Sequence, residues 1–229
     1  MPAGPLTPPP AGPWVEQWLS PARHAKYLAA AGGNIQRALE LYDWNSQVSG
    51  ALMRDLGHVE IALRNAYAEV IAQYWAGQAT DWTRSATTLF APLYRIRNGA
   101  RVDINAQQRA QLQAACDRVR PTDPTGKVIA ELSFGFWRFL SSSAHEKTVW
   151  VRYLYQAYPP GTDRKRDVDR KIATLNRLRN RVAHHEPLIS ENLPAEAVKI
   201  NALGALLNPD LGLYLKATSA VPKLLACRP

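Results

Sequence analysis

The sequence is poor in cysteine, with Cys116 and Cys227 as the only two among 229 residues. They stand far apart, so neither a disulfide framework nor a zinc site built on thiolates is expected. We interpret both as small buried apolar side chains. Long apolar runs are missing as well, because the run over 128–140 is interrupted by Glu131 and Arg138. A membrane-spanning helix needs roughly 18 uninterrupted apolar residues, so the chain is not expected to cross a membrane.

The amino-terminal segment has neither the basic start nor the apolar centre of a secretory signal. Residues 1–13 instead contain six prolines with small residues between them. Such a composition does not form a helix and buries little surface. We therefore expect a disordered leader over 1–13, a single domain over 14–229 and a cytoplasmic location.

Familiar catalytic signatures are also missing from the sequence. It contains no Walker-type phosphate loop, no dinucleotide-binding fingerprint, no His-Glu-x-x-His pair and no nucleophile elbow. No acidic cluster suggests a metal site. These absences exclude most common enzyme classes, and no cofactor is expected.

Positive charge is what the sequence has in excess. It holds 28 Lys and Arg against 19 Asp and Glu, a net charge of +9, and 46% of its residues are hydrophobic. The hydrophobic fraction is ordinary for a globular domain with a sizeable core. The charge favours polyanionic partners, with nucleic acid first and an anionic membrane surface second.

Helical periodicity runs through nearly the whole chain, so the fold is predicted to be all-α. The longest stretch, 35–75, has apolar residues at three- and four-residue steps. It is one long helix, or two joined near Trp44-Asn45. A shorter helix before it begins with Ser20-Pro21 as cap and first-turn proline and ends at Gly32-Gly33, and Asn34 caps the next.

Further helices are expected along the rest of the chain, and no internal repeat is present. An irregular loop with one short helix is predicted over 80–103. The predicted helices cover 105–118, 126–140, 143–158 with a capping box at Ser143 and Glu146, 163–187, and one or two segments between 194 and 227 that break at Asn208-Pro209. The helix over 163–187 has an apolar face made by Val168, Ile172, Leu175, Leu178 and Val182.

Arg179, Asn180 and His184 form the candidate catalytic group at the end of that last helix. Asn180 and His184 stand four residues apart and share a face, and Arg179 has a side chain long enough to reach the same spot. An arginine can clamp phosphate oxygens, and a histidine titrates near neutrality and can transfer a proton. RNA supplies its own nucleophile, the 2′-hydroxyl, so the group suits metal-independent cleavage of RNA. The alternative is that these basic residues only stabilise the helix dipole.

Glu60, Arg64, Asn65 and His185 are possible supporting residues. Glu60 and Arg64 either form an ion pair within their helix or face the catalytic group, where Glu60 would orient the guanidinium or the imidazole. His184 and His185 could bind a metal only with further ligands, because neighbouring helical side chains point about 100° apart. No metal site is therefore expected.

Two further sets of side chains are candidates for contacting RNA. The aromatic set of Phe134, Phe136, Trp137 and Phe139 beside Arg138 either stacks nucleobases or belongs to the core or a dimer interface. The basic set precedes and surrounds the catalytic group and is expected to draw RNA towards it. It comprises Arg164, Lys165, Arg170, Lys171, Arg177 and Arg181.

The segment Leu178-Arg179-Asn180-Arg181-Val182-Ala183-His184-His185-Glu186-Pro187 resembles the Arg-Asn-x-x-x-His motif of HEPN-domain proteins. Its setting resembles the bacterial Abi-like (abortive infection) family. Three further passages are similar to that family, at 41–65, 126–140 and 164–181. Together they extend the resemblance over most of the chain, from about Leu19 to Leu188.

The resemblance implies a HEPN-like multi-helix bundle that often dimerises and a metal-independent endoribonuclease acting as a toxin or phage-defence effector. Arg179 corresponds to the arginine of the motif, Asn180 to the polar residue after it and His184 to its histidine. His185 is an additional histidine, and which imidazole reaches the phosphate stays open. The implied partners are RNA, a second copy in a homodimer and an antitoxin or regulatory RNA. The alternative is a non-catalytic RNA-binding or protein-interaction module.

Overall fold

The computed structural model describes residues 8–75, 78 and 80–229 of the chain. Helices dominate it, and its one sheet within these residues has two strands. The all-α prediction is therefore confirmed apart from this small sheet. Among the described helices, none is both long and apolar enough to cross a membrane.

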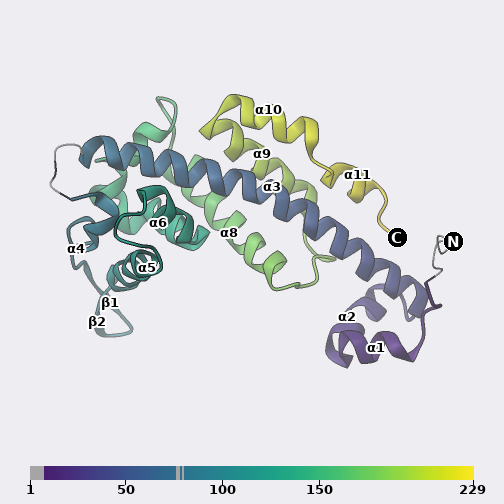
Figure 1. Ribbon diagram of the computed structural model, residues 1–229. Coiled ribbons are helices and arrows are strands. Elements are labelled where there is room, and N and C mark those ends of the chain that lie inside the picture. Colours follow the sequence, from purple (N-terminus) through teal and green to yellow (C-terminus); the bar gives the residue numbers. More distant parts are fainter. Residues whose placement is uncertain (1–7, 76–77, 79) are drawn as a thin grey trace.

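Helix α3, Ile35–Trp75, is the spine of the molecule and is one continuous helix of 41 residues (Figure 1). The Asn34 side chain caps it by accepting a hydrogen bond from the Arg37 backbone N–H at 2.9 Å, as predicted. Its inner stripe is fully buried at Val48, Leu52, Leu56, Val59 and Leu63. The stripe ends before Tyr74, which is about half exposed.

The other elements surround this spine. In chain order they are α1 (Pro13–Leu19), α2 (Pro21–Ala30), η1 (Trp82–Arg84), α4 (Ala86–Leu89), β1 (Tyr94–Arg97), β2 (Ala100–Asp103), α5 (Ala106–Asp117), α6 (Thr125–Glu131), α7 (Phe134–Leu140), η2 (Ser143–His145), η3 (Glu146–Trp150), η4 (Leu154–Ala157), η5 (Arg164–Asp169), α8 (Arg170–Ala183), α9 (Leu193–Leu207), α10 (Pro209–Thr218) and α11 (Val221–Ala226). Helices α7, α8, α9 and α11 pack directly on α3, and α10 packs on α9. Helices α1 and α2 lie at the beginning of α3, and the segment from η1 to α6 lies near its other end (Figure 1).

The amino-terminal prediction meets the structure only in part. Residues 1–7 of the predicted leader lie outside the described residues, and α1 begins at Pro13. The first-turn proline of α2 is confirmed at Pro21. Ser20 does not cap that helix with its side chain, because it adopts a left-handed φ of 70°.

The short helix predicted within 80–103 is confirmed as α4, but the rest of that segment is not an irregular loop, because it contains the hairpin of β1 and β2. The strands are antiparallel, with Tyr94 opposite Asp103 and Arg97 opposite Ala100. Asn98 and Gly99 connect them with φ values of 49° and 76°. An Asn-Gly pair in left-handed conformations is the favoured connection of a two-residue hairpin.

Two predicted helices are broken in the structure. The helix over 126–140 divides into α6 and α7, because Leu132 is extended and the Ser133 hydroxyl caps α7 by accepting from the Phe136 N–H. The segment 143–158 forms only the short turns η2, η3 and η4. The predicted capping box is not formed, since the Glu146 carboxylate pairs with Arg164 at 3.1 Å instead.

The helix predicted over 163–187 begins as the π-helical turn η5, which the Asp163 carboxylate caps, and continues as α8. Its predicted apolar face is confirmed, and every member is buried. The helix ends at Ala183 rather than at Pro187, because His185 adopts a left-handed φ of 54°.

The carboxyl-terminal part holds three helices, one more than predicted. The predicted break is confirmed at Asn208, whose side chain caps α10 by accepting from the Asp210 and Leu211 N–H groups. The aromatic set belongs mainly to the core, since Phe134, Phe136 and Trp137 are buried. The prediction of two buried cysteines is wrong, because Cys116 is half-buried and Cys227 is exposed at the end of α11.

Candidate functional site

Arg179 and Asn180 lie in the last turns of α8, and His184 follows at the residue that caps its carboxyl end. The His184 backbone N–H donates to the Asn180 carbonyl at 2.9 Å, which keeps these two residues one helical turn apart. Asn180 and His184 are exposed, and the Arg179 side chain is 34% exposed. The catalytic candidates therefore lie at the molecular surface.

Glu60, in the second half of α3, is the partner of Arg179. Its Oε2 atom lies 3.8 Å from the Arg179 Nε atom, an ion pair between two helices. The backbone N–H of Phe134, at the start of α7, lies near the same carboxylate. Of the two alternatives for Glu60, these contacts favour the one in which it faces the α8 group. Glu60 thus joins three helices, α3, α7 and α8.

Burial raises the pKa of Glu60 above its usual value, and the charges of Arg179 and Arg64 and the Phe134 N–H oppose that rise. Arg64 is half-buried beside it, with a buried Nε–H that has no hydrogen-bond partner among the described residues. The Nε–H of Arg179 is likewise buried, and it makes no hydrogen bond because its ion pair with Glu60 spans 3.8 Å. Asn65, the next residue of α3, is exposed. Two guanidinium groups therefore lie beside one carboxylate.

His185 is directed to a different place from the rest of the group. It lines an open groove of about 660 Å³ with Val182 of α8 and with Tyr42, Ser49 and Met53 of α3. The left-handed backbone at His185 separates it from the helical path that His184 still follows. The two adjacent histidines are therefore not equivalent.

The predicted basic surface is smaller than expected, because two of its arginines are used inside the fold. Arg164 is buried, where it donates to the Ser141 carbonyl at 2.9 Å and pairs with Glu146 at 3.1 Å. Its expected exposure to RNA is wrong for that reason. Arg181 pairs with Glu186 and Glu191 and donates to the Pro187 carbonyl, so it holds the loop after α8.

The other four residues of the predicted basic set lie at or near the molecular surface. Lys165, Arg170 and Arg177 are exposed, and Lys171 is half-buried near Asp167 at 3.8 Å. Their exposure leaves three cations open along η5 and α8.

Sequence reasoning missed Asn176 of α8. Its Oδ1 atom would lie 3.8 Å from a Cβ atom placed on Gly135, so it faces the start of α7, near the Phe134 N–H that also lies near Glu60. The sequence spacing could have indicated it, because Asn176 stands three residues before Arg179 and four before Asn180. It therefore lies on the same side of the helix as both.

Fold and site together define a class of protein, an all-helical bundle that carries an arginine, an amide and a histidine at the end of one helix. Residues 14–190, more than half of the chain, match the family model described as Abi-like protein. The chain belongs to the Abi-like protein family. The match includes Glu60, Arg179 and His184, and it ends before α9. Neither the curated proteins nor the solved structures contain a match to the chain.

Proposed function

We propose that this protein is a metal-independent endoribonuclease that acts as a toxin or phage-defence effector. Membership of the Abi-like family suggests a role in abortive infection. The observation that carries the chemical proposal is the Arg179 guanidinium, paired with Glu60 and lying in the turn before the exposed His184.

The proposed reaction is an internal transfer at one phosphodiester. The RNA 2′-oxygen forms a bond to phosphorus as the bond from phosphorus to the 5′-oxygen breaks, leaving a 2′,3′-cyclic phosphate and a 5′-hydroxyl end. An imidazole takes the proton of the 2′-hydroxyl, and an imidazolium gives one to the departing oxygen. His184 performs one of these transfers, and His184 of a second copy in a homodimer would supply the other. Arg179 stabilises the charge that develops on the phosphate, and Asn180 orients the reacting groups.

The exposed part of the Arg179 guanidinium supports a phosphate at this place. The Arg179 side chain is 34% exposed, and its Nε atom is directed at Glu60. The other N–H groups of a guanidinium can donate charge-assisted hydrogen bonds to phosphate oxygens, which are stronger than neutral ones.

The direct test incubates the purified protein with total RNA in the presence of EDTA. The wild type is expected to produce fragments ending in a 2′,3′-cyclic phosphate. His184→Ala should cleave at least about 100-fold more slowly, the usual cost of losing a general acid or base. His185→Asn is the matched control, because asparagine tolerates the left-handed backbone of that position, and it should stay near wild-type rates. RNA that stays intact with the wild type, across several substrates, would overturn the proposal.

A growth assay separates the enzyme from a non-catalytic module. Expression of the wild type in bacteria is expected to arrest growth, and Arg179→Ala should relieve the arrest. A binding module would instead bind RNA in a salt-dependent way that His184→Ala leaves unchanged, without toxicity.

A further inference from the structure

The β1–β2 hairpin is a basic arm that adds little to the core. It carries Arg95, Arg97 and Arg101, and all of its strand residues except Asp103 are exposed. Among the described residues, none of these three arginines forms an ion pair. The Arg101 guanidinium lies over the Tyr94 ring at 4.0 Å. Three unpaired positive charges are therefore displayed on one short ribbon.

The base of the arm is firmly held. The Asp103 carboxylate accepts hydrogen bonds from the backbone N–H groups of Leu93, at 2.9 Å, and Asn105, at 3.1 Å. It also pairs with Arg109, which donates to the Phe90 carbonyl at 2.8 Å. Phe90 is fully buried in the core. The arm is thereby fixed in direction, although its strands project from the body (Figure 1).

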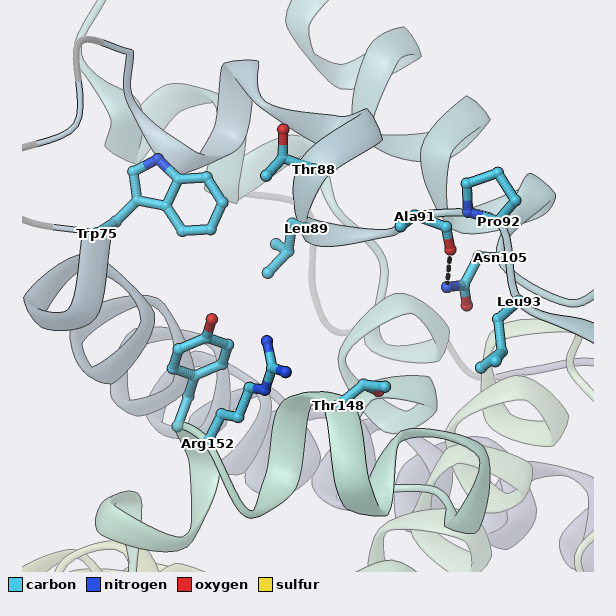
Figure 2. Close-up of a pocket in the computed structure, with 10 residues that line it drawn as sticks. Trp75, Thr88, Leu89, Ala91, Pro92, Leu93, Asn105, Thr148 and Arg152 are labelled. Atoms are coloured by element: carbon cyan, nitrogen blue, oxygen red, sulfur yellow. Dashed lines mark hydrogen bonds between the residues drawn. The ribbon is translucent and has the colours of Figure 1, made fainter.

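A pocket of about 250 Å³ opens at the base of the same arm, between the end of α3 and the loop before β1 (Figure 2). The Trp75 indole and the Arg152 guanidinium lie at its edges, and Leu93 and Asn105 lie on the arm side. Asn105 is 4% exposed and donates from its amide nitrogen to the Ala91 carbonyl at 2.8 Å. Its Oδ1 atom is buried and receives no hydrogen bond. The pocket therefore combines an aromatic face, a cation and an unused acceptor.

We propose that the arm and this pocket bind single-stranded RNA, with one nucleobase in the pocket and neighbouring phosphates on the arginines. The Trp75 face offers stacking, and the Asn105 Oδ1 atom would accept a hydrogen bond from a base amino or imino group. Arginines suit phosphate oxygens, and a basic track with aromatic platforms is the usual form of a site for single strands. The volume admits one small planar group. This inference rests on the proposed function in taking RNA as the ligand, and it concerns a second site at the far end of α3.

The arm is tested by RNA binding in a His184→Ala background, so that cleavage cannot interfere. Fluorescence anisotropy measures the affinity for a labelled single-stranded RNA over a range of salt concentrations. Replacing Arg95, Arg97 and Arg101 by alanine should lower the slope of log affinity against log salt by about 2, since each phosphate contact contributes about 0.7. The control replaces Lys26, Arg37 and Lys216, three exposed cations elsewhere, and so removes the same charge. Equal slopes for the two triple variants would overturn the inference.

The pocket is tested with Arg152→Gln and Trp75→Leu in the same background. Each should weaken RNA binding about tenfold, and an RNA without bases should bind wild type and Trp75→Leu alike. Arg152 is exposed, so Arg152→Gln is expected to keep the fold even if Trp75→Leu disrupts it. If a free nucleoside monophosphate binds tightly, and its affinity does not change when the arm arginines are replaced, the proposed RNA site is refuted. Cleavage of RNA by the wild type is measured separately. Failure of the arm to affect RNA binding is therefore distinguishable from failure of the protein to cleave RNA.

Discussion

At the scale of single residues, Arg179 depends on Glu60 for its position, because their ion pair links α8 to α3 at 3.8 Å. We predict that Glu60→Gln, which keeps the shape but removes the charge, lowers kcat/KM about 10- to 100-fold, as loss of an orienting partner does. Stability should change by no more than about 1 kcal/mol, since both side chains of the pair are partly exposed. Steady-state cleavage and urea unfolding provide the measurements. Glu69→Gln, an exposed change on the same helix, is the control.

The raised pKa of Glu60 also predicts a pH effect on the same pair. Burial favours the protonated carboxyl, so the ion pair is complete above the raised pKa and is lost as the pH falls through it. Wild-type cleavage should therefore decline on the acid side, and Glu60→Gln should lack that part of the decline. A pH profile of kcat/KM for both proteins is the measurement, and identical acid limbs would contradict the assignment.

His145 gives a separate prediction for stability. It is fully buried against Phe139, and burial lowers its pKa from 6.5 to about 4. Between these values the unfolded chain binds more protons than the folded one, so stability is complete above pH 6.5 and falls as the pH drops towards 4. The full loss is about 3 kcal/mol. Urea unfolding measures the free energy of unfolding at pH 7 and at pH 4.5. The decrease between these two values should be smaller for His145→Leu than for the wild type, and equal decreases would refute the prediction.

At the scale of elements, α9 and α10 meet through two glycines, Gly204 of α9 and Gly212 of α10. A Cβ atom on Gly212 would lie 2.5 Å from the Cβ atom of Ala205 and 2.8 Å from its Cα atom, so the helices must shift to admit it. Gly212→Ala is predicted to destabilise the protein by about 1 to 3 kcal/mol. Gly57→Ala on α3, where the added atom meets nothing within 4 Å, should stabilise it by about 0.5 to 1 kcal/mol. Thermal unfolding of both variants measures the difference, and a neutral Gly212→Ala would contradict the close packing.

The elements that sequence reasoning predicted well are those whose periodicity is long and whose caps are local. Helix α3 has both, with Asn34 at its start, and α8 shows a complete apolar face. The hairpin was missed because its strands are exposed and bury no alternating face, although Asn98-Gly99 marked the turn. The turns η2 to η4 depend on Arg164 reaching back to Ser141 and Glu146, a contact that no local pattern reveals.

The candidate site was predictable to a similar degree. The spacing of Asn180 and His184 follows from the helix alone, whereas the Arg179 to Glu60 pair requires knowing how α8 crosses α3. The end of α8 at Ala183 depends on the left-handed His185, which a single sequence does not specify. That turn separates the two histidines, so only the structure distinguishes them.

At the scale of the whole molecule, the exposure of Asn180 and His184 leaves room for a second copy to complete the site. We predict that light scattering gives a mass of twice 25.5 kDa under the conditions of cleavage. Specific activity should rise with protein concentration over the range in which the mass doubles. Full activity at a concentration where the protein is a monomer would contradict the shared site.

The net charge of +9 is distributed unevenly in the fold. Arg164 and Arg181 are used for internal contacts, whereas η5, α8 and the hairpin arm carry unshielded cations. Two separate surfaces of the fold, η5 with α8 and the hairpin arm, therefore expose clusters of cations.

The continuous α3 helix sets the separation of these two surfaces. Glu60 and Trp75 are both on it, 15 positions apart, which corresponds to about 22 Å at the helical rise of about 1.5 Å per residue. Because α3 is one continuous helix, it would hold the proposed cleavage group and the proposed base pocket at a constant distance. An RNA shorter than this span could reach one of the two but not both, so cleavage efficiency should show a threshold in substrate length.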